Sequence, residues 1–266
     1  MHPLLTSTIR AYPVFLGLAP LTAGLVVTIV LRTTGMPARR MLALIAWLAV
    51  GGIGGAKLWS VLERGALAFP LGAELLDGYR QPGAWIGLAG ALALCRPRWT
   101  GFQRRALADA VALAACFGIV MFRIGCFLNG CCTGIPGSLP WCLRYPMYSS
   151  VWANHVVAGL IGSDAPMSLP VHPLPLYFAA LALALGCVLL RLWPRRAWDG
   201  QLAVVFLAVD GIGKFLLEFL RASPAPVVQA ASLVSGVAGL AVLAAVGSVA
   251  ERVASRDPGE RAALAG

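Results

Sequence analysis

Residues 123–134, with the sequence RIGCFLNGCCTG, combine a guanidinium, an amide and three thiols in one short stretch. The stretch begins inside a long apolar run, where a charge such as that of Arg123 costs several kcal/mol unless it is paired or hydrated. It then leaves the run through Asn129 and two glycine-led turns. A guanidinium at the end of an apolar helix, followed by a tightly turning polar loop, predicts a site for an anionic group at a membrane surface. The alternative is an arginine whose long side chain only carries its charge to the interface.

A second group of ionisable residues lies further along the chain. Asp210, Lys214, Glu218 and Arg221 occupy positions i, i+4, i+8 and i+11. On a helix these positions fall within an arc of about 80°, so they form one stripe on one face. Because the signs alternate, neighbours can pair and lower the cost of burial. The stripe indicates a functional site; the alternative is a structural stripe that neutralises itself.

The composition shows which kind of molecule must position these groups. The 266 residues are 59% hydrophobic and 12% charged, with a mean hydropathy of +0.80. Such a chain predicts an all-α integral membrane protein, with residues 1–266 forming a single polytopic domain. The net charge of +10 does not indicate a nucleic-acid partner, because the basic residues lie between apolar runs and form no continuous patch.

Seven apolar runs predict about seven transmembrane helices. They cover residues 14–31, 41–60, 83–95, 106–127, 173–193, 201–221 and 226–248. The first run lacks a cleavage site, and basic residues follow it, so we expect no cleavable signal peptide. The glycines in the second and third runs indicate close helix packing. Thirteen of the 21 Lys and Arg residues flank the runs on one side and five on the other, which predicts an external N-terminus and a cytoplasmic C-terminus.

Three cations, Lys57, Arg123 and Lys214, lie inside apolar runs. The runs that contain them all travel outward in this topology. Lys214 precedes Arg221 by seven residues, or about 10 Å of helix. All three cations are therefore expected in the outer half of the bilayer, whereas chance placement would scatter them.

Residues 128–172, between the fourth and fifth runs, predict an irregular external cap. The segment is rich in proline and has few periodic apolar residues. His172 stands directly before Pro173 at the start of the next run. A single histidine at such a position is more often an interfacial residue than a ligand.

Seven cysteines fall into two sets. The three within apolar runs, Cys95, Cys116 and Cys187, are expected to be small buried hydrophobes. The four at the outer side are Cys126, Cys131, Cys132 and Cys142. We expect one or two disulfides among these four, with Cys126 as a candidate free thiol. A metal site is the weaker interpretation, because Cys-x4-Cys-Cys is not a standard zinc spacing.

These motifs resemble the prolipoprotein diacylglyceryl transferases of bacterial inner membranes. Residues 122–134 are similar to the family signature Gly-Arg-x-Gly-Asn-Phe-x-Asn-x-Glu-x-x-Gly. Residues 172–177 resemble the beginning of its His-Pro-x-Gln-Leu-Tyr-Glu element, and residues 210–221 resemble Tyr-Gly-x-x-Arg-x-x-x-Glu-x-x-Arg. Residues 54–57 resemble a Gly-Gly-Arg turn. The similarity extends over most of residues 50–225.

The chain departs from these patterns at several positions. Cys126 and Cys131 replace the signature Asn and Glu, and Lys57 and Lys214 replace arginines. A family histidine is missing near Ile86. The chain therefore resembles a divergent, cysteine-bearing branch whose activity can differ from that of the family.

The resemblance implies transfer of the diacylglyceryl group of phosphatidylglycerol to the lipobox cysteine of a preprolipoprotein, without a cofactor or metal. It implies Arg123 as the main phosphate clamp and Lys214 as a second catalytic cation. The implied substrate-binding residues are Asn129, Gly130, Gly134, Lys57, His172, Tyr177, Glu218 and Arg221. Two candidates remain for the general base that accepts the thiol proton: Glu218 and a deprotonated Lys214.

Two other functions are compatible with the same residues. One is a membrane thiol protein that uses Cys126, Cys131 and Cys132 for redox exchange or for binding a soft metal. The other is a paralogue that binds lipid and has lost turnover.

Overall fold

The computed structural model describes residues 11–32, 36–64, 81–95, 104–223 and 226–254. Its helices are α1 (Ala11–Arg32), α2 (Ala38–Arg64), α3 (Gln81–Leu94), α5 (Arg104–Asn129), α6 (Ser150–Val157), α7 (Leu174–Leu192), the 3₁₀ helix η2 (Trp193–Arg195), α8 (Gln201–Glu218) and α9 (Pro226–Ala254). Six of the arginines behind the predicted orientation, Arg10, Arg80, Arg96, Arg98, Arg256 and Arg261, lie outside these ranges.

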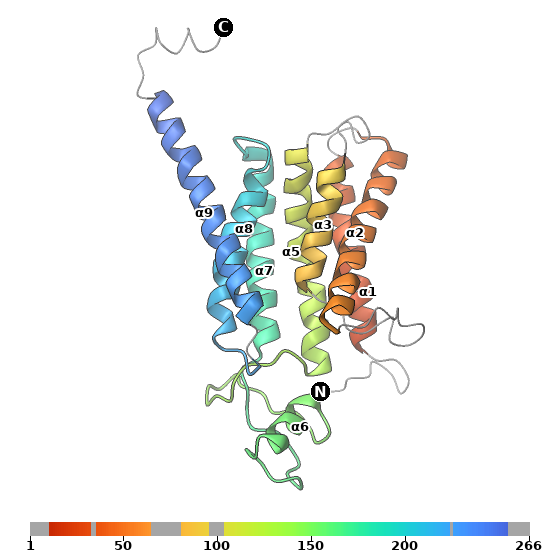
Figure 1. The fold of residues 1–266 in the computed structure, drawn as a ribbon, viewed down its shortest axis with the longest axis vertical. Helices are drawn as coiled ribbons and strands as arrows, with labels where there is room; N and C mark the ends of the chain where they lie inside the picture. The colour runs from red at the N-terminus through yellow and green to blue at the C-terminus, as the bar shows by residue number, and fades with distance from the viewer. Residues whose placement is uncertain (1–10, 33–35, 65–80, 96–103, 224–225, 255–266) are drawn as a thin grey trace.

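Each of the seven predicted apolar runs is a helix, and together these helices form one elongated bundle (Figure 1). Five of the helices, α1, α2, α5, α7 and α9, are long and apolar enough to cross a membrane. Helix α3 is shorter, with 14 residues. Helix α8 has the length of a span but carries the charged stripe. The expected all-α membrane fold is confirmed, and the cap with α6 lies at one end of the bundle.

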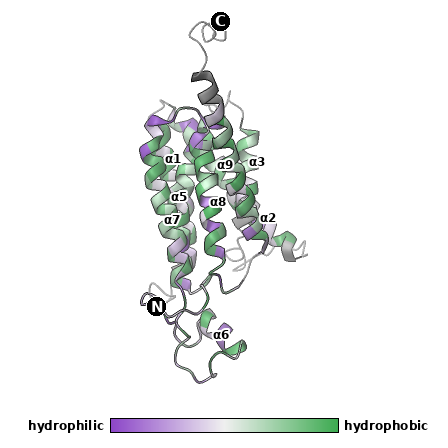
Figure 2. Ribbon diagram, turned by 90° about the vertical axis from the view of Figure 1, so that its left-hand side faces the viewer, coloured by the Kyte–Doolittle hydropathy of each residue, from purple (hydrophilic) through white to green (hydrophobic). Residues whose placement is uncertain are grey.

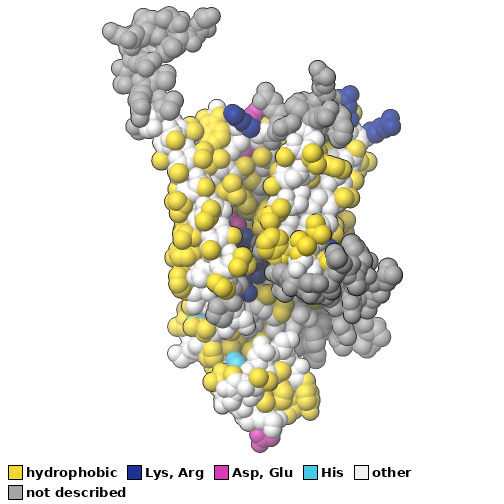
Figure 3. Space-filling model, in the orientation of Figure 1, with side chains coloured by type: hydrophobic (Ala, Val, Ile, Leu, Met, Phe, Trp, Pro, Cys, Tyr) yellow, Lys and Arg dark blue, Asp and Glu magenta, His cyan; other side chains and the backbone are white. Residues whose placement is uncertain are grey.

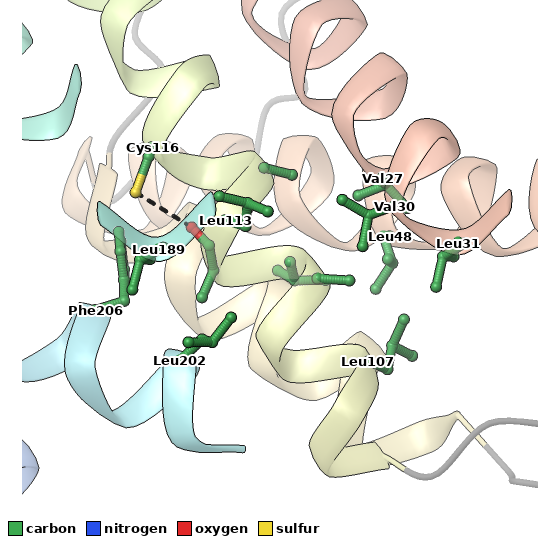
Figure 4. Close-up of a cluster of buried hydrophobic side chains, with 14 of the residues drawn as sticks. Val27, Val30, Leu31, Leu48, Leu107, Leu113, Cys116, Leu189, Leu202 and Phe206 are labelled. Atoms are coloured by element: carbon green, nitrogen blue, oxygen red, sulfur yellow. Dashed lines mark hydrogen bonds between the residues drawn. The ribbon is translucent and has the colours of Figure 1, made fainter. Parts of the chain in front are cut away.

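Helix α5 is the centre of the bundle. It packs along α1 and α7 and also contacts α8, while α2 pairs with α3 and α8 with α9. Fully buried side chains at one level of four helices, Leu31, Leu107, Leu189 and Leu202, mark the apolar core (Figure 4). All four lie near the ends of their helices away from the cap, so the apolar core extends to that end of the bundle.

The start of α8 is fixed by a carboxylate from another helix. Gly200, the N-cap residue of α8, has no side chain to cap the helix. Asp109 of α5 is fully buried, and its two oxygens accept hydrogen bonds from the Gly200 and Ala203 amides at 2.8 and 2.9 Å. Arg196 adds a positive charge 3.7 Å from the same carboxylate. The unsatisfied amides of the first turn of α8 are therefore paired across the bundle.

Helices α2 and α3 approach so closely that only glycine fits between them. A Cβ built on Gly87 would lie 2.1 Å from the Gly51 carbonyl oxygen, and one on Gly55 would lie 2.3 Å from that of Gly83. The packing role expected for these glycines is confirmed at these four positions. Close packing of this pair fixes where the side chains of α3 meet the rest of the bundle.

The helices of the bundle consist largely of hydrophobic residues (Figure 2), and many of these are exposed, as a lipid-facing surface requires. Leu21 on α1 and Val234 on α9 are 69% and 68% exposed. Figure 3 shows basic and acidic side chains between these apolar surfaces at mid-height. Cys187 belongs to the exposed set, so its expected burial is wrong; Cys95 and Cys116 are buried as expected. An exposed thiol on α7 costs little where its surroundings are lipid.

Candidate active site

The signature loop begins where α5 ends in a tight C-terminal cap. Gly130 has φ of +68°, and its amide donates to the Phe127 carbonyl. The Cys131 amide donates to the Cys126 carbonyl, five residues earlier. These two bonds form a Schellman motif, for which glycine is the favoured residue at the left-handed position. The motif places Cys131 next to Cys126 although four residues separate them.

Three cysteine sulfurs gather at this cap. The Sγ atoms of Cys126, Cys131 and Cys132 all lie within 4.8 Å of one another. Cys132 is itself in the left-handed region, with φ of 57°, which turns the chain back over the end of α5. All four outer cysteines are free thiols, so the expected disulfides are not formed in this structure. In the sequence, the signal for this cluster was the i, i+5 spacing of Cys126 and Cys131 on either side of a glycine. This spacing differs from that of zinc fingers.

The residues that follow the cysteines form hydrogen bonds with the chain just before α7 and just after α8. The Gly134 amide donates to the His172 carbonyl at 3.0 Å, and the Ile135 amide donates to the Leu220 carbonyl at 2.8 Å. A Cβ on Gly134 would lie 2.7 Å from His172 Cβ, so glycine is required at this position. The backbone after the cysteines is therefore fixed between the beginning of α7 and the end of α8.

Two arginines meet at one aromatic ring inside this junction. Arg123 is 4% exposed, and its guanidinium carbon lies 4.3 Å from the centre of the Phe178 ring. The guanidinium carbon of Arg221 lies 5.9 Å from the same ring. Phe178 is buried near the start of α7. Helix α5 and the segment directly after α8 thus each supply a guanidinium, and α7 supplies the aromatic ring that both contact.

The charged stripe of α8 consists of two ion pairs. The Lys214 ammonium lies 2.7 Å from an Asp210 oxygen. Arg221 forms a two-point contact with the Glu218 carboxylate, in which Nη2 donates to Oε1 at 2.7 Å. The two ion pairs make the stripe neutral in sum, as the structural alternative predicted. The stripe also lies beside Arg123, so it both neutralises itself and belongs to the candidate site.

Helix α3 covers the stripe with an aromatic ring. The Lys214 ammonium lies 5.5 Å from the centre of the Trp85 ring, and Trp85 also contacts Phe206 at 5.6 Å between ring centres. Trp85 directly precedes Ile86, near which the family pattern has a histidine. Arg123 and Lys214 are close enough for their like charges to oppose each other. Lys57 is 7% exposed in the cap-side part of α2, so all three predicted intramembrane cations are buried in the cap-side half.

His172 and Tyr177, two of the remaining predicted residues, lie where the cap meets the start of α7. His172 Nδ1 lies 3.1 Å from the Tyr177 hydroxyl, which also accepts a hydrogen bond from Trp141 at 2.7 Å. The His172 ring also packs against Gly137, where a Cβ would lie 2.5 Å from His172 Nε2. Sequence reasoning identified His172 and Tyr177 but not Trp141. In the sequence, Trp141 was distinguished only by being an aromatic residue in an otherwise irregular segment.

Charges around the cysteine cluster shift the pKa values of the groups outside the helices. Hydrogen bonds from Cys126 and Cys131, with the charges of Arg123 and Arg221, hold the pKa of the Cys132 thiol well below its ordinary value. For Cys131 a hydrogen bond with Cys126 lowers the pKa, but contact with Cys132 and burial outweigh it and raise the pKa to about 11. The thiol of Cys132 is therefore more easily deprotonated than that of Cys131.

The fold and this site define a class of protein: a multi-pass membrane protein with buried cations gathered beneath a cap at one end. The family model described as prolipoprotein diacylglyceryl transferase matches residues 3–246. The chain belongs to this family.

Three relatives illustrate the similarity, and all are named phosphatidylglycerol–prolipoprotein diacylglyceryl transferase. The protein from Leifsonia xyli is 28% identical over 242 residues, covering 84% of this chain and 68% of the relative. The one from Ruegeria pomeroyi is 31% identical over 71% of this chain and 64% of the relative. The second such transferase of Clostridium perfringens is 31% identical over 56% of this chain. The chain spans 52% of the length of that last relative.

Proposed function

We propose that this protein transfers the diacylglyceryl group of phosphatidylglycerol to a cysteine thiol of a prolipoprotein. One observation carries the proposal: Arg123 of α5 and Arg221, directly after α8, contact the same buried Phe178 ring beneath the cap. Transfer breaks the bond between a glycerol carbon and a phosphate oxygen and forms a carbon–sulfur thioether. The thiol proton balances the charge of the departing glycerol phosphate. A cationic site out of bulk water stabilises such a leaving group strongly.

Arg123 is the main phosphate clamp in this proposal, because a planar guanidinium binds two phosphate oxygens at once. Lys214 contributes a second, compact charge that Asp210 holds in position at 2.7 Å. Glu218 keeps Arg221 oriented toward the site. Asn129, Gly130 and Gly134 shape the loop around the headgroup, with Lys57, His172 and Tyr177 at its margins.

The proposed acceptor is the lipobox peptide of a preprolipoprotein, which meets the lipid at the outer face of the bacterial cytoplasmic membrane. One feature supports the cap as the outer side. Described basic residues such as Arg32, Arg39 and Arg105 lie at the helix ends away from the cap, as the positive-inside rule requires of the cytoplasmic side. In this orientation the N-terminus is external and the C-terminus cytoplasmic.

A transfer assay tests the proposal. Purified protein in detergent receives phosphatidylglycerol and a lipobox peptide, and release of glycerol phosphate is followed. We expect Arg123→Lys to lower the rate by about 100-fold or more, because an ammonium keeps the charge but loses the two-point contact. Arg144→Lys is the matched control, because Arg144 is an exposed cap arginine bonded to the Ser168 carbonyl.

The control should keep the wild-type rate. Equal rates for Arg123→Lys and the wild type would refute the phosphate clamp. A folded wild-type protein that binds lipid but releases no glycerol phosphate would refute the transferase and favour a lipid-binding paralogue.

A further inference from the structure

The cysteine cluster at the end of α5 has the form of a coordination site. Three sulfurs from Cys126, Cys131 and Cys132 lie within 4.8 Å of one another. At a metal–sulfur distance of about 2.3 Å, two sulfurs bound to one ion are separated by at most about 4.6 Å. Small side-chain rotations are therefore enough to bring all three onto one ion.

The backbone holds these sulfurs together without help from a cross-link. The Schellman hydrogen bond sets Cys131 over Cys126, and the left-handed Cys132 returns the third sulfur to the same point. A non-glycine residue in this conformation costs free energy that the surrounding structure must offset. The hydrogen bonds of residues 133–135 to the ends of α7 and α8 supply that restraint.

Burial is graded across the cluster as in a site with a closed base and an open entrance. Cys126 is 1% exposed, whereas Cys131 and Cys132 are half-buried. Tyr145 packs against Gly130 from the cap side and is itself 1% exposed. Its hydroxyl makes no hydrogen bond to the described part of the chain. A buried hydroxyl beside the sulfurs is a ready outer-sphere partner for a metal-bound thiolate.

The surrounding charges suit an anionic metal–thiolate complex. Three thiolates around a monovalent ion carry a net charge of −2, and around a divalent ion −1. Arg123 in α5 and Arg221 directly after α8 both act electrostatically on Cys132. Because Glu218 already balances the charge of Arg221, it is chiefly Arg123 that offsets the negative charge of three ligated sulfurs, which an isolated trio of cysteines in a membrane protein would lack.

We infer that Cys126, Cys131 and Cys132 form a three-thiolate binding site for a soft metal ion, Cu(I) or Zn(II), at the cap end of α5. Thiolate sulfur selects these ions over hard cations such as Mg²⁺. Because cysteine binds a metal as the thiolate, binding competes with protons and strengthens as the pH rises. The two ions differ in what they need: Zn(II) completes a tetrahedron with a fourth ligand such as water. No fourth His, Cys, Asp or Glu joins the cluster among the described residues.

Metal titration of the full-length protein in detergent tests the site. The protein is reduced with a phosphine, the reductant is removed without oxygen, and Cu(I) or Zn(II) is added in competition with a chromophoric chelator. Mg²⁺ serves as the hard-ion control. We expect one soft ion per chain and metal–sulfur distances of about 2.3 Å by X-ray absorption.

Single Cys→Ser variants at positions 126, 131 and 132 should each weaken binding by more than the roughly 10- to 100-fold that loss of an outer-sphere partner costs. Cys142→Ser is the matched control, because Cys142 lies in the same cap outside the cluster; its affinity should stay unchanged. Cys131→Ser and Cys132→Ser alter half-buried positions, so they decide the question if Cys126→Ser does not fold.

Absence of binding by the reduced wild type would overturn the inference, as would binding that survives substitution at any of the three positions. An equal loss in Cys142→Ser would overturn it as well. The readout is metal bound per chain and does not depend on transfer activity. The metal site and the proposed transferase can therefore fail separately.

Discussion

At the scale of residues, the Glu218–Arg221 pair is expected to be the more costly of two similar pairs to break. Its carboxylate side chain is 3% exposed, so Glu218→Gln leaves a buried guanidinium without its counter-charge. Such a change costs about 3–5 kcal/mol. Asp199→Asn removes a partner at the same i,i+3 spacing from Arg196, but the Asp199 side chain is 40% exposed, and exposed pairs contribute at most about 1 kcal/mol. Equilibrium unfolding in mixed detergent micelles measures both, and equal losses would contradict the burial argument.

The sequence predicted the charged residues of the site better than the apolar and backbone features that bring them together. Arg123, Lys214 and the α8 stripe were identifiable because a charge in an apolar run is unusual. The shared Phe178 ring was not, because a phenylalanine in an apolar helix carries no distinguishing signal. The disulfide prediction rested on the expected outer location and overlooked the Schellman cap, which brings the sulfurs together without bonding them.

At the scale of elements, contact between α2 and α3 should tolerate no side chain at Gly87. The added methyl of Gly87→Ala would meet the Gly51 carbonyl oxygen at 2.1 Å and the Gly55 Cα at 2.8 Å. Because backbone atoms cannot move aside, the helices must separate, at a cost of about 1–3 kcal/mol. Gly90→Ala is the matched control on the same helix, since nothing lies within 4 Å of its Cβ.

Thermal unfolding in detergent compares the two variants. The Gly87 variant should unfold at a lower temperature, and the Gly90 variant should match the wild type. Separation of α2 from α3 also shifts Trp85 relative to Lys214, so the Gly87 variant is expected to lose transfer activity as well. Equal stability of the two variants would show that the helices are not in such close contact.

Helix α6 should make the cap sensitive to acid through His155. Burial lowers the pKa of His155 below its ordinary value of 6.5, and its Nδ1 accepts a hydrogen bond from the Leu169 amide at 3.2 Å. Below about pH 6.5 the unfolded cap therefore binds a proton that the folded cap excludes, so stability present above that pH is lost as the pH falls. Hydrogen exchange of the Leu169 amide should speed up on acidification.

His155→Gln provides the control, because its amide oxygen can accept the same hydrogen bond and does not titrate. Exchange in that variant should not respond to pH beyond the intrinsic chemistry of exchange. A wild-type response that persists in the variant would assign the sensitivity to another group.

Apolar runs of membrane-spanning length predicted the spans, since hydropathy and length are read directly from sequence. The cap resisted prediction beyond its irregularity. Its shape depends on isolated backbone pairings, such as Gly134 with Arg221 and Pro136 with Val171, which join segments far apart in the chain. Such pairings leave no local periodicity.

At the scale of the whole molecule, the candidate site lies at one end of the bundle. Leu31, Leu107, Leu189, Leu202 and the Asp109 cap of α8 lie away from the cap, whereas Arg123, Lys214 and the thiols lie near it. The buried cations of the site are therefore separated from this part of the apolar core. This division also links the site to one membrane face, so orientation becomes a functional property.

Labelling from one side of the membrane tests that orientation. Val157 in the cap is 89% exposed, and Ala197 is exposed in the turn at the other end of the bundle. With the native cysteines blocked or replaced, a membrane-impermeant maleimide should label Val157→Cys in spheroplasts and Ala197→Cys only after lysis, because the arginine-rich end faces the cytoplasm. The opposite pattern would place the site on the cytoplasmic face, out of reach of a secreted lipoprotein precursor, and would exclude the proposed acceptor.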